Sequence, residues 1–268
     1  MGILNKGISM KITLYYYSGA GNTKFVAKKI KQKFQKLDYK ITYVKINNNS
    51  IVNIESSDAY IIGFPIYDLT SPQLVKDLIS NIEDTHKSIS FFCTKAFASG
   101  NSILELSSLS KKQNLETIAT LELYMPGTDA LIFFAKPNSL SEKVLKFFHS
   151  RNIDKKVDIF VSKIIKKQKS VIRQKWYTYF SFLIPQKAKD KFHSQYTKYV
   201  PEFYSQSDIC IECMKCVNEC PRENIRFDEY IKFDLNCDMC LHCVHHCPTE
   251  SIQIGNFTQG NVRYKKFS

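Results

Sequence analysis

Apolar and polar residues follow two different periods along residues 11–125. Short apolar runs rich in β-branched and aromatic side chains are typical of buried strands, and they occur at residues 11–18, 40–46, 59–67, 88–97 and 115–125. Between these runs, apolar residues recur at helical spacing, at residues 22–37, 71–82 and 101–112. Strands that alternate with helices in this way predict an α/β fold, in which helices cover both faces of an open parallel five-stranded sheet.

The pattern changes in the middle of the chain. From Ser139 onward, apolar residues recur at helical spacing, which predicts a long amphipathic helix that is broken or bent near Asn152. We expect the first part of this helix to complete the helical layer over the sheet, so that the N-terminal domain spans residues 10–170. Residues 171–206 mix aromatic and basic side chains around Trp176, and we expect them to form a helical connector.

The last part of the chain shows a third pattern. Apolar and polar residues alternate in two short segments, 225–233 and 252–254, which predicts short strands. Segments of this length are too short for an independent core, so bound metal would have to hold this part of the chain together. We therefore expect a small α+β domain at residues 207–256, followed by a tail at residues 257–268.

Eight of the nine cysteines lie between residues 210 and 247. The segments CIECMKCVNECP (210–221) and CDMCLHCVHHCP (237–248) both read C-x2-C-x2-C-x3-C-P. Bacterial ferredoxins with two [4Fe–4S] clusters have this spacing, and in them the fourth cysteine of each run ligates the cluster of the other run. A disulfide framework is not expected, because the cysteines are gathered in one region rather than spread through a secreted domain.

The spacing assigns four ligands to each cluster. The first cluster would be held by Cys210, Cys213, Cys216 and Cys247. The second would be held by Cys220, Cys237, Cys240 and Cys243. Structural zinc is the alternative, since CxxC pairs also suit tetrahedral zinc, but zinc does not explain two C-P endings in register. Three histidines in the second run are expected to be solvated or to tune the clusters rather than to bind iron: His242, His245 and His246.

Charge is distributed unevenly, and this bears on the partners of the protein. The net charge is +13, of which residues 136–206 contribute +11 (16 Lys and Arg against 5 Asp and Glu), whereas residues 207–252 carry −5 (4 against 9). The basic segment allows three interpretations: a bridge between the two domains, a docking face for an acidic redox partner, or contact with an anionic membrane surface. Nucleic-acid binding is not expected, because no recognition motif accompanies the charge.

The segment SGAGNT, Ser18 to Thr23, lies where the first strand ends and the first helix begins. It is not a Walker loop, since G-x-x-x-x-G-K-[ST] is absent, and it is not the dinucleotide fingerprint, since Lys24 stands at the third glycine. What remains is a set of hydroxyl, amide and backbone N–H groups at a helix N-terminus, which suits a single terminal phosphate. An ordinary strand–turn–helix with small residues is the alternative.

The segment around Ser18 to Thr23 and the cysteine repeat both resemble known families. The stretch YYYSGAGNT resembles the S/T-G-T-G-N-T loop of flavodoxins, which binds the phosphate of FMN, and the resemblance implies the flavodoxin-like strand order 2-1-3-4-5. With the cysteine repeat, residues 10–256 resemble the flavodoxin–ferredoxin fusion proteins of anaerobic microbes. The implied phosphate-binding residues are Ser18, Gly19, Ala20, Gly21, Asn22 and Thr23. Ala20 departs from the Thr of many flavodoxins, which removes one hydroxyl and leaves the backbone N–H.

The same resemblance implies that two further loops contact the flavin ring. One follows the third strand, where Tyr67 or Phe64 could stack on the ring and Pro65 stiffens the turn. The other follows the fourth strand, and its candidate residues are Thr94, Phe97, Gly100 and Asn101.

Together these features predict an iron–sulfur electron-transfer protein that passes electrons between two [4Fe–4S] clusters and an FMN. The expected flavin site has no obvious catalytic acid, base or nucleophile, which favours a carrier over an enzyme. Two alternatives remain open: a flavin-dependent reductase of a small acceptor, and a redox partner protein whose flavodoxin-like domain is empty. Redox proteins are the expected partners. Because the chain has no apolar run of about 18 residues and no signal peptide, we expect no transmembrane helix and a cytoplasmic location.

Overall fold

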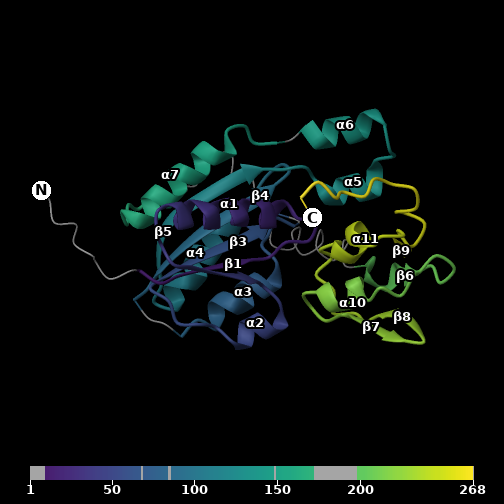
Figure 1. The fold of residues 1–268 in the computed structure, drawn as a ribbon, viewed down its shortest axis with the longest axis horizontal. Coiled ribbons are helices and arrows are strands. Elements are labelled where there is room, and N and C mark those ends of the chain that lie inside the picture. The colour runs from purple at the N-terminus through teal and green to yellow at the C-terminus, as the bar shows by residue number, and fades with distance from the viewer. Residues whose placement is uncertain (1–9, 68, 84–85, 148, 172–197, 268) are drawn as a thin grey trace, which may run out of the picture.

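The computed structural model describes residues 10–267 except residues 68, 84–85, 148 and 172–197. The N-terminal half is built around a parallel five-stranded sheet (Figure 1). Its strands are β1 (Ile12–Tyr16), β2 (Ile41–Lys45), β3 (Ala59–Pro65), β4 (Ser88–Lys95) and β5 (Glu116–Tyr124). Their order in the sheet is β2-β1-β3-β4-β5, so the flavodoxin-like order that the sequence implied is confirmed.

Successive side chains of a strand point to opposite faces of the sheet, and here both faces are buried. Leu14 and Tyr16 pack on one face of the sheet, whereas Tyr15 and Tyr17 pack on the other. The first face is covered by α1 (Asn22–Lys36) and α7 (Ile153–Ile165). The second face is covered by α3 (Gln73–Ser80) and α4 (Ser102–Lys112), with the short α2 (Asn48–Val52) beside α3. Burial on both faces explains why the strands are almost continuously apolar.

The long helix expected from Ser139 onward is two helices. The first, α6 (Leu140–Phe147), has no buried residue, and the second, α7, begins after Asn152, whose φ of 56° is left-handed. α7 packs against α1 and β5, whereas α6 lies away from the sheet (Figure 1). The expectation that the first part of this segment completes the helical layer is therefore wrong. The apolar positions that face the sheet begin only at Ile153.

Helix α5 (Thr128–Phe134) follows β5 and was not expected from the sequence pattern. Its Ile132 packs into the core of the C-terminal domain, and its Leu131 packs against the tail. The tail itself runs back over the N-terminal domain: the Val262 N–H donates to the Ala135 carbonyl at 2.9 Å. α5 and the tail thus connect the two halves of the molecule.

The C-terminal domain consists of short elements. They are η1 (Val200–Glu202), β6 (Phe203–Ser205), α10 (Lys215–Glu219), β7 (Ile225–Asp228), β8 (Tyr230–Phe233), α11 (His242–His246) and β9 (Ile252–Ile254). β6 pairs with β9 and β7 pairs with β8, both antiparallel. The offset of 27 residues between the cysteine runs is repeated in the structure, since α10 and α11 begin after the left-handed residues Met214 and Leu241. The small α+β domain expected at the C-terminus is confirmed.

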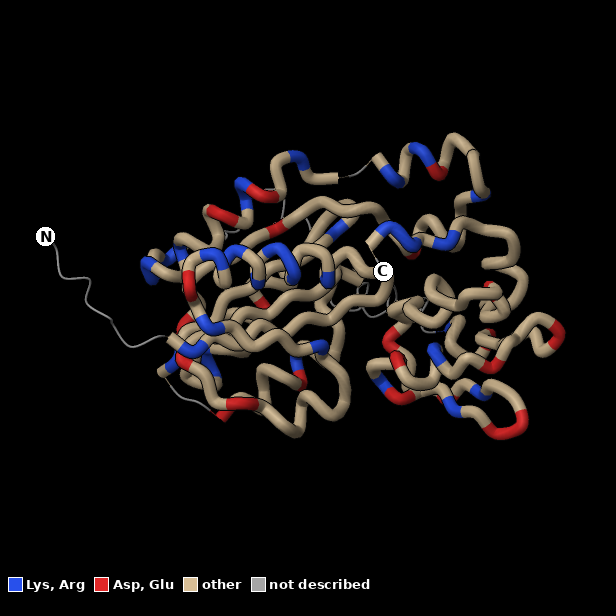
Figure 2. Tube along the Cα trace, viewed as in Figure 1, with Lys and Arg blue, Asp and Glu red and all other residues tan. Residues whose placement is uncertain are grey.

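Most of the expected connector, including Trp176, lies outside the described residues. Figure 2 shows Lys and Arg along α1 and Asp and Glu on outer loops of the C-terminal domain. Among the helices that the structure describes, none is long and apolar enough to cross a membrane.

Candidate functional site: a nucleotide pocket beside two cysteine sets

The segment from Ser18 to Thr23, which we call the phosphate loop, joins the carboxyl end of β1 to α1 and includes the first two residues of that helix. Gly21 precedes the helix with a φ of 95°, a left-handed conformation that glycine adopts without strain. The Ser18 Oγ accepts a hydrogen bond from the Lys24 N–H at 3.3 Å, and the Thr23 hydroxyl bonds that of Thr94 at 2.8 Å. The loop therefore presents backbone N–H groups at a helix N-terminus, the arrangement that binds phosphate.

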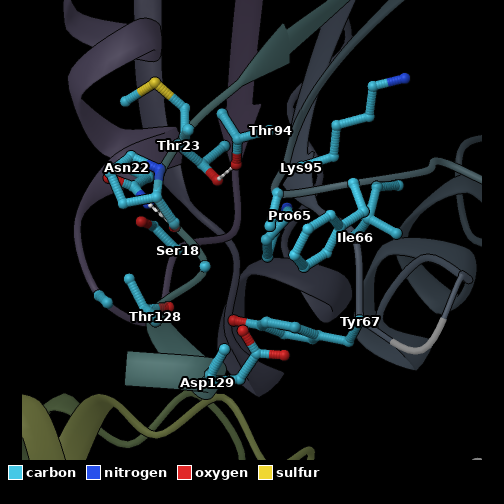
Figure 3. Close-up of a pocket in the computed structure, with 18 of the residues that line it drawn as sticks. Ser18, Asn22, Thr23, Pro65, Ile66, Tyr67, Thr94, Lys95, Thr128 and Asp129 are labelled. Carbon is cyan, nitrogen blue, oxygen red and sulfur yellow. Dashed lines mark hydrogen bonds between the residues drawn. The ribbon is translucent and has the colours of Figure 1, made fainter. Parts of the chain in front are cut away.

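A cavity of about 280 Å³ opens at the carboxyl ends of β1, β3, β4 and β5 (Figure 3). Most of the residues implied by the flavodoxin resemblance line it: Ser18, Gly19, Ala20, Asn22, Thr23, Pro65, Tyr67, Thr94 and Phe97. Gly21, Gly100 and Asn101 are not part of the lining. Asn101 instead lies at the start of α4, and Phe64 is fully buried in the sheet, which leaves Tyr67 as the aromatic residue of its loop at the cavity.

The short loop after β5 and the first turn of α5 also line the cavity, and the sequence-based prediction did not include them. Residues 125–130 contribute to the wall, and the Asn22 Nδ2 donates to the Pro126 carbonyl at 3.1 Å. The signal was present, since Pro126-Gly127 follows the fifth strand, and ligands bind at the carboxyl ends of parallel strands. The Asn22 Oδ1 is buried and has no hydrogen-bond partner within the part of the chain that the structure describes, so this side chain keeps one acceptor for a ligand.

Tyr67 and Asp129 form one side of the cavity. In Figure 3 the Tyr67 hydroxyl points toward the phosphate loop, with the Asp129 carboxylate beside it. Burial raises the pKa of Tyr67 well above its usual range, although a hydrogen bond from the Gly19 backbone acts in the opposite direction. Burial also raises the pKa of Asp129, and hydrogen bonds from its own N–H and that of Ala130 oppose this. Asp129 therefore places an acidic group near the phosphate loop.

Lys95 borders the cavity but is engaged elsewhere. Its side chain is 5% exposed, and its Nζ pairs with Glu122 and donates to the Ser99 Oγ at 3.3 Å. Figure 3 shows its amine pointing away from the phosphate loop. Lys95 therefore stabilises the end of β4 against β5 rather than supplying a charge to the cavity.

These groups fit FMN. The backbone amides and the hydroxyls of Ser18 and Thr23 suit a phosphate monoester, and the largely apolar remainder of the wall suits a flat ring. The cavity volume lies near the lower end of the range of roughly 300–1,000 Å³ for small-molecule sites.

The first cysteine set lines a small cavity of its own. Cys210, Cys213, Cys216 and Cys247 all border it, together with Met214. Burial, together with smaller contributions from the charges of Cys247 and Cys213, raises the pKa of Cys216 to about 11. Cys247, from the second run, is thus brought to the first three cysteines of the first run.

The second cysteine set is also grouped around a residue from the other run. Burial raises the pKa of Cys237 to about 12 and that of Cys240 to about 11. Cys220 contributes to the increase at Cys237, Cys240 and Cys243 because its charge is close to all three. Two sets of four thiols suit two [4Fe–4S] clusters, and the binding of iron by these thiols stays a prediction. A site for a single metal ion is a different arrangement, and no group of three or more His, Cys, Asp or Glu among the described residues forms one.

The histidines of the second run are largely buried rather than solvated. His245 is fully buried, and burial lowers its pKa to about 3, while the pKa of His246 is lowered to about 4. The His245 Nδ1 accepts a hydrogen bond from the Tyr264 N–H at 3.2 Å. Burial also lowers the pKa of His242, opposed by its hydrogen bonds to Gly19 and Glu219. Of the two expected roles, the solvated one does not hold, because α11 packs against the tail and the phosphate loop, and a role in tuning the clusters stays a prediction.

The second cysteine run lies directly against the phosphate loop. The His242 Nδ1 donates to the Gly19 carbonyl at 2.7 Å. A Cβ at Gly19 would overlap the Cys240 carbonyl oxygen, and Cys240 itself packs against the core beneath β1. The φ of Gly19 is not left-handed, so the glycine is required here for close approach between the domains.

Further contacts join the C-terminal domain to the end of β2 and to α2. The Lys45 Nζ donates to the Glu219 carbonyl at 2.9 Å. The Asn48 N–H donates to the Pro221 carbonyl at 3.1 Å, and its Nδ2 donates to the Arg222 carbonyl at 3.1 Å. The acceptors are main-chain carbonyls on either side of Cys220, so this cysteine is also held near the N-terminal domain.

Residues 202–248 match the family model of the 4Fe-4S dicluster domain. A flavodoxin-like sheet and a 4Fe-4S dicluster domain therefore occur in one chain, which is the architecture of a flavodoxin–ferredoxin fusion. This combination supports a role in electron transfer. A comparison with curated proteins found no match.

Several solved structures are similar to the N-terminal part. A short-chain flavodoxin associated with a bacterial microcompartment is 13% identical, with 59% of this chain and 97% of that chain covered and a TM-score of 0.44. Flavodoxin 2 from Bacillus cereus is 17% identical, with coverage of 59% and 99% and a TM-score of 0.44. A flavodoxin mutant from Fusobacterium nucleatum bound to flavin mononucleotide is 14% identical, with coverage of 60% and 99% and a TM-score of 0.42.

Proposed function

We propose that the protein is an electron carrier that binds two [4Fe–4S] clusters in its C-terminal domain and FMN in its N-terminal pocket. The observation that carries the proposal is the contact between the two sites, in which the backbone of Cys240 meets the phosphate loop at Gly19. An FMN in the pocket and a cluster on the adjoining cysteines would lie on either side of one interface, so electrons would pass between them without a further carrier. When bound, the clusters supply one-electron chemistry and FMN supplies one- or two-electron chemistry.

The residues of the chain would bind the FMN and the two clusters and hold them at separate sites. The phosphate loop from Ser18 to Thr23 would hold the FMN phosphate, and Tyr67 and Pro65 would border the ring. Cys210, Cys213, Cys216 and Cys247 would hold one cluster, and Cys220, Cys237, Cys240 and Cys243 the other. Buried apolar residues such as Leu241 and Val244 exclude water from the thiols.

Redox proteins are the proposed partners. Cys213 and its neighbours Ile211 and Glu212 are exposed, and Ile211 is 62% exposed. A partner that docks here would contact the first cysteine set directly, so electrons would not have to pass through the N-terminal domain. The acidic balance of residues 207–252 favours a partner with a basic face.

Cofactor analysis of the full chain tests the proposal. The protein would be purified without oxygen, and iron, zinc, acid-labile sulfide and acid-released FMN would be measured per chain. We expect about eight iron atoms, about eight sulfides and one FMN. Cys213→Ser should lower the iron content. Zinc in place of iron, or no iron at all, would overturn the proposal.

The same measurements separate the alternatives. Eight irons without FMN would make the N-terminal domain an empty docking module, and the carrier would then contain clusters alone. Turnover of a small acceptor with no second protein present would identify a flavin-dependent reductase. An unchanged iron content in Cys213→Ser would contradict the ligand assignment.

A further inference from the structure

His242 is the side chain with which the C-terminal domain binds the phosphate loop. It is the first residue of α11, and its side chain is 11% exposed. Its Nδ1 lies 2.7 Å from the Gly19 carbonyl oxygen. A carbonyl oxygen can only accept a hydrogen bond, so the Nδ1 carries a proton and donates it. One domain thus donates a hydrogen bond to the backbone of the nucleotide site in the other.

The ring of His242 is held in this orientation by two neighbours. Its Nε2 forms a hydrogen bond with the Glu219 Oε2 at 2.6 Å, and its face stacks on the ring of His246, with 4.2 Å between the centroids. Glu219 is itself tied to the N-terminal domain, because the Lys45 Nζ donates to its carbonyl at 2.9 Å. With the ring held at Nε2 and on one face, the Nδ1 has a fixed direction, toward Gly19.

The acceptor of this hydrogen bond shares a peptide unit with the Ala20 N–H. The peptide bond is trans and planar, so its carbonyl and its N–H point in opposite directions. Because the Gly19 carbonyl points to α11, the Ala20 N–H points away from the C-terminal domain, and Ala20 lines the nucleotide pocket. Within the part of the chain that the structure describes, this N–H has no hydrogen-bond acceptor. It is therefore available to a ligand.

Ala20 can offer a phosphate only its backbone. The residue is 6% exposed, and it packs in an apolar cluster with Leu131, Val262 and Tyr264. An alanine packs here without burying a hydroxyl, which is costly when it has no partner. Since the position lacks the hydroxyl of the threonine in many flavodoxin loops, its contribution to phosphate binding depends on the direction of the N–H, which His242 sets.

We propose that His242 is a positioning residue of the nucleotide site: its Nδ1 fixes the peptide between Gly19 and Ala20 so that the Ala20 N–H donates to the phosphate of FMN. The inference rests on the proposed function, because it requires FMN in the pocket. It gives the C-terminal domain a part in nucleotide binding in addition to holding the clusters. Because the contact is with the phosphate, His242 favours FMN over riboflavin, which is the same molecule without the phosphate.

Titration of the full chain with FMN and with riboflavin tests this proposal. The protein is purified without oxygen, its flavin is removed at neutral pH so that the iron stays bound, and flavin fluorescence gives both dissociation constants. Asn and Leu have the same shape, but only Asn carries a nitrogen donor on Cγ, where histidine carries Nδ1. We expect His242→Leu to weaken FMN binding by about 10-fold or more and to leave riboflavin binding unchanged. His242→Asn should bind FMN nearly as tightly as wild type.

Asn48→Ala is the control, because it removes a different hydrogen bond between the domains, from the Asn48 Nδ2 to the Arg222 carbonyl, and both groups lie outside the phosphate loop. It should leave the FMN affinity unchanged. Looser docking of the domains would weaken both flavins alike, so the ratio of the two dissociation constants isolates the contact with the phosphate.

Three results would overturn the inference: equal FMN affinities of His242→Leu and His242→Asn, equal losses of FMN and riboflavin affinity, or a loss of FMN affinity in Asn48→Ala as large as in His242→Leu. In each case FMN binding by the wild type would still support the proposed function. A wild-type protein that binds no FMN would overturn both.

Discussion

At the scale of single residues, Gly19 and Asp129 have roles that the sequence alone does not reveal. Gly19 resembles a phosphate-loop glycine, yet its missing side chain makes room for the Cys240 carbonyl. Asp129 lies in the first turn of α5, which the flavodoxin resemblance did not include, and it brings a carboxylate close to the phosphate loop. Both residues connect the nucleotide pocket to features outside it.

Gly19→Ala should weaken the contact between the domains. The added methyl group would overlap the Cys240 backbone, which cannot move as a flexible side chain could, so we expect a loss of about 1–3 kcal/mol in the free energy of unfolding. Denaturant unfolding of the full chain measures this loss. Gly127→Ala is the comparison, because the nearest atom there, the Ala96 Cβ, is 3.1 Å away, a tight contact rather than an overlap, so we expect a smaller loss than for Gly19→Ala. Equal stability of Gly19→Ala and wild type would contradict the close contact.

Asp129→Asn should stabilise the protein at neutral pH. Burial raises the folded-state pKa of Asp129 above its ordinary value, so the wild type loses stability as the pH rises through that raised pKa and the carboxyl becomes charged. The variant avoids this loss, and the difference should disappear at pH values below the ordinary range of Asp. Unfolding midpoints measured across this pH range provide the test. A variant that is less stable than wild type at pH 7 would show that the charge is favourable.

Removal of the Asp129 charge should also strengthen FMN binding. A carboxylate near the phosphate loop repels the phosphate of the nucleotide, and the asparagine keeps the size of the side chain. Titration of apoprotein with FMN, followed by flavin fluorescence, gives the affinity. Equal affinities of Asp129→Asn and wild type would show that the carboxylate does not act on the phosphate.

At the scale of elements, the sequence predicted the regular parts and missed the irregular ones. The five strands and the helices from Asn22 and Ser102 follow strong periodic patterns. α5 has only seven residues, and its apolar run ALIFF has no helical period. Its two apolar sides are explained by neighbours far along the chain, namely the C-terminal domain and the tail. Such long-range packing leaves no local signal. The segment from Met125 to Ala130 did carry one, the Pro126-Gly127 turn after the fifth strand, but the sequence-based prediction did not use it.

Ile132→Ala tests the role of α5 in joining the domains. The side chain is fully buried in the core of the C-terminal domain, so we expect a loss of about 2–5 kcal/mol in unfolding free energy. Phe134→Ala on the same helix is the control, because Phe134 is 78% exposed and its removal should change stability by less than about 0.5 kcal/mol. Similar effects of the two substitutions would contradict the packing of α5 on the C-terminal domain.

At the scale of the whole molecule, the two domains differ in what stabilises them. The N-terminal domain has two large apolar cores on either side of the sheet. The C-terminal domain has one small core, to which α5 contributes and in which cysteines are among the packed residues. The first domain should therefore be stable by itself, whereas the second depends on its metal.

Removal of iron by a chelator should unfold the C-terminal domain and leave the sheet folded. Hydrogen exchange followed by mass spectrometry should show loss of protection at residues 200–256, with protection kept in β1, β3 and β4. The protein before chelation is the reference. Full protection of residues 200–256 after complete iron removal would show that the small core is sufficient without metal.

Lys45 and Asn48 donate to main-chain carbonyls of the C-terminal domain, and this limits which changes in sequence the interface tolerates. A carbonyl is present whatever the side chain, so substitutions at the acceptor positions Glu219, Pro221 and Arg222 keep these hydrogen-bond acceptors. An insertion or deletion would move the carbonyls away from their donors. The hydrogen bonds of Lys45 and Asn48 therefore constrain the length of the loop around Cys220 rather than its side chains, whereas position 19 still requires glycine. A ferredoxin domain grafted from another protein would dock here only if its loops had the same number of residues.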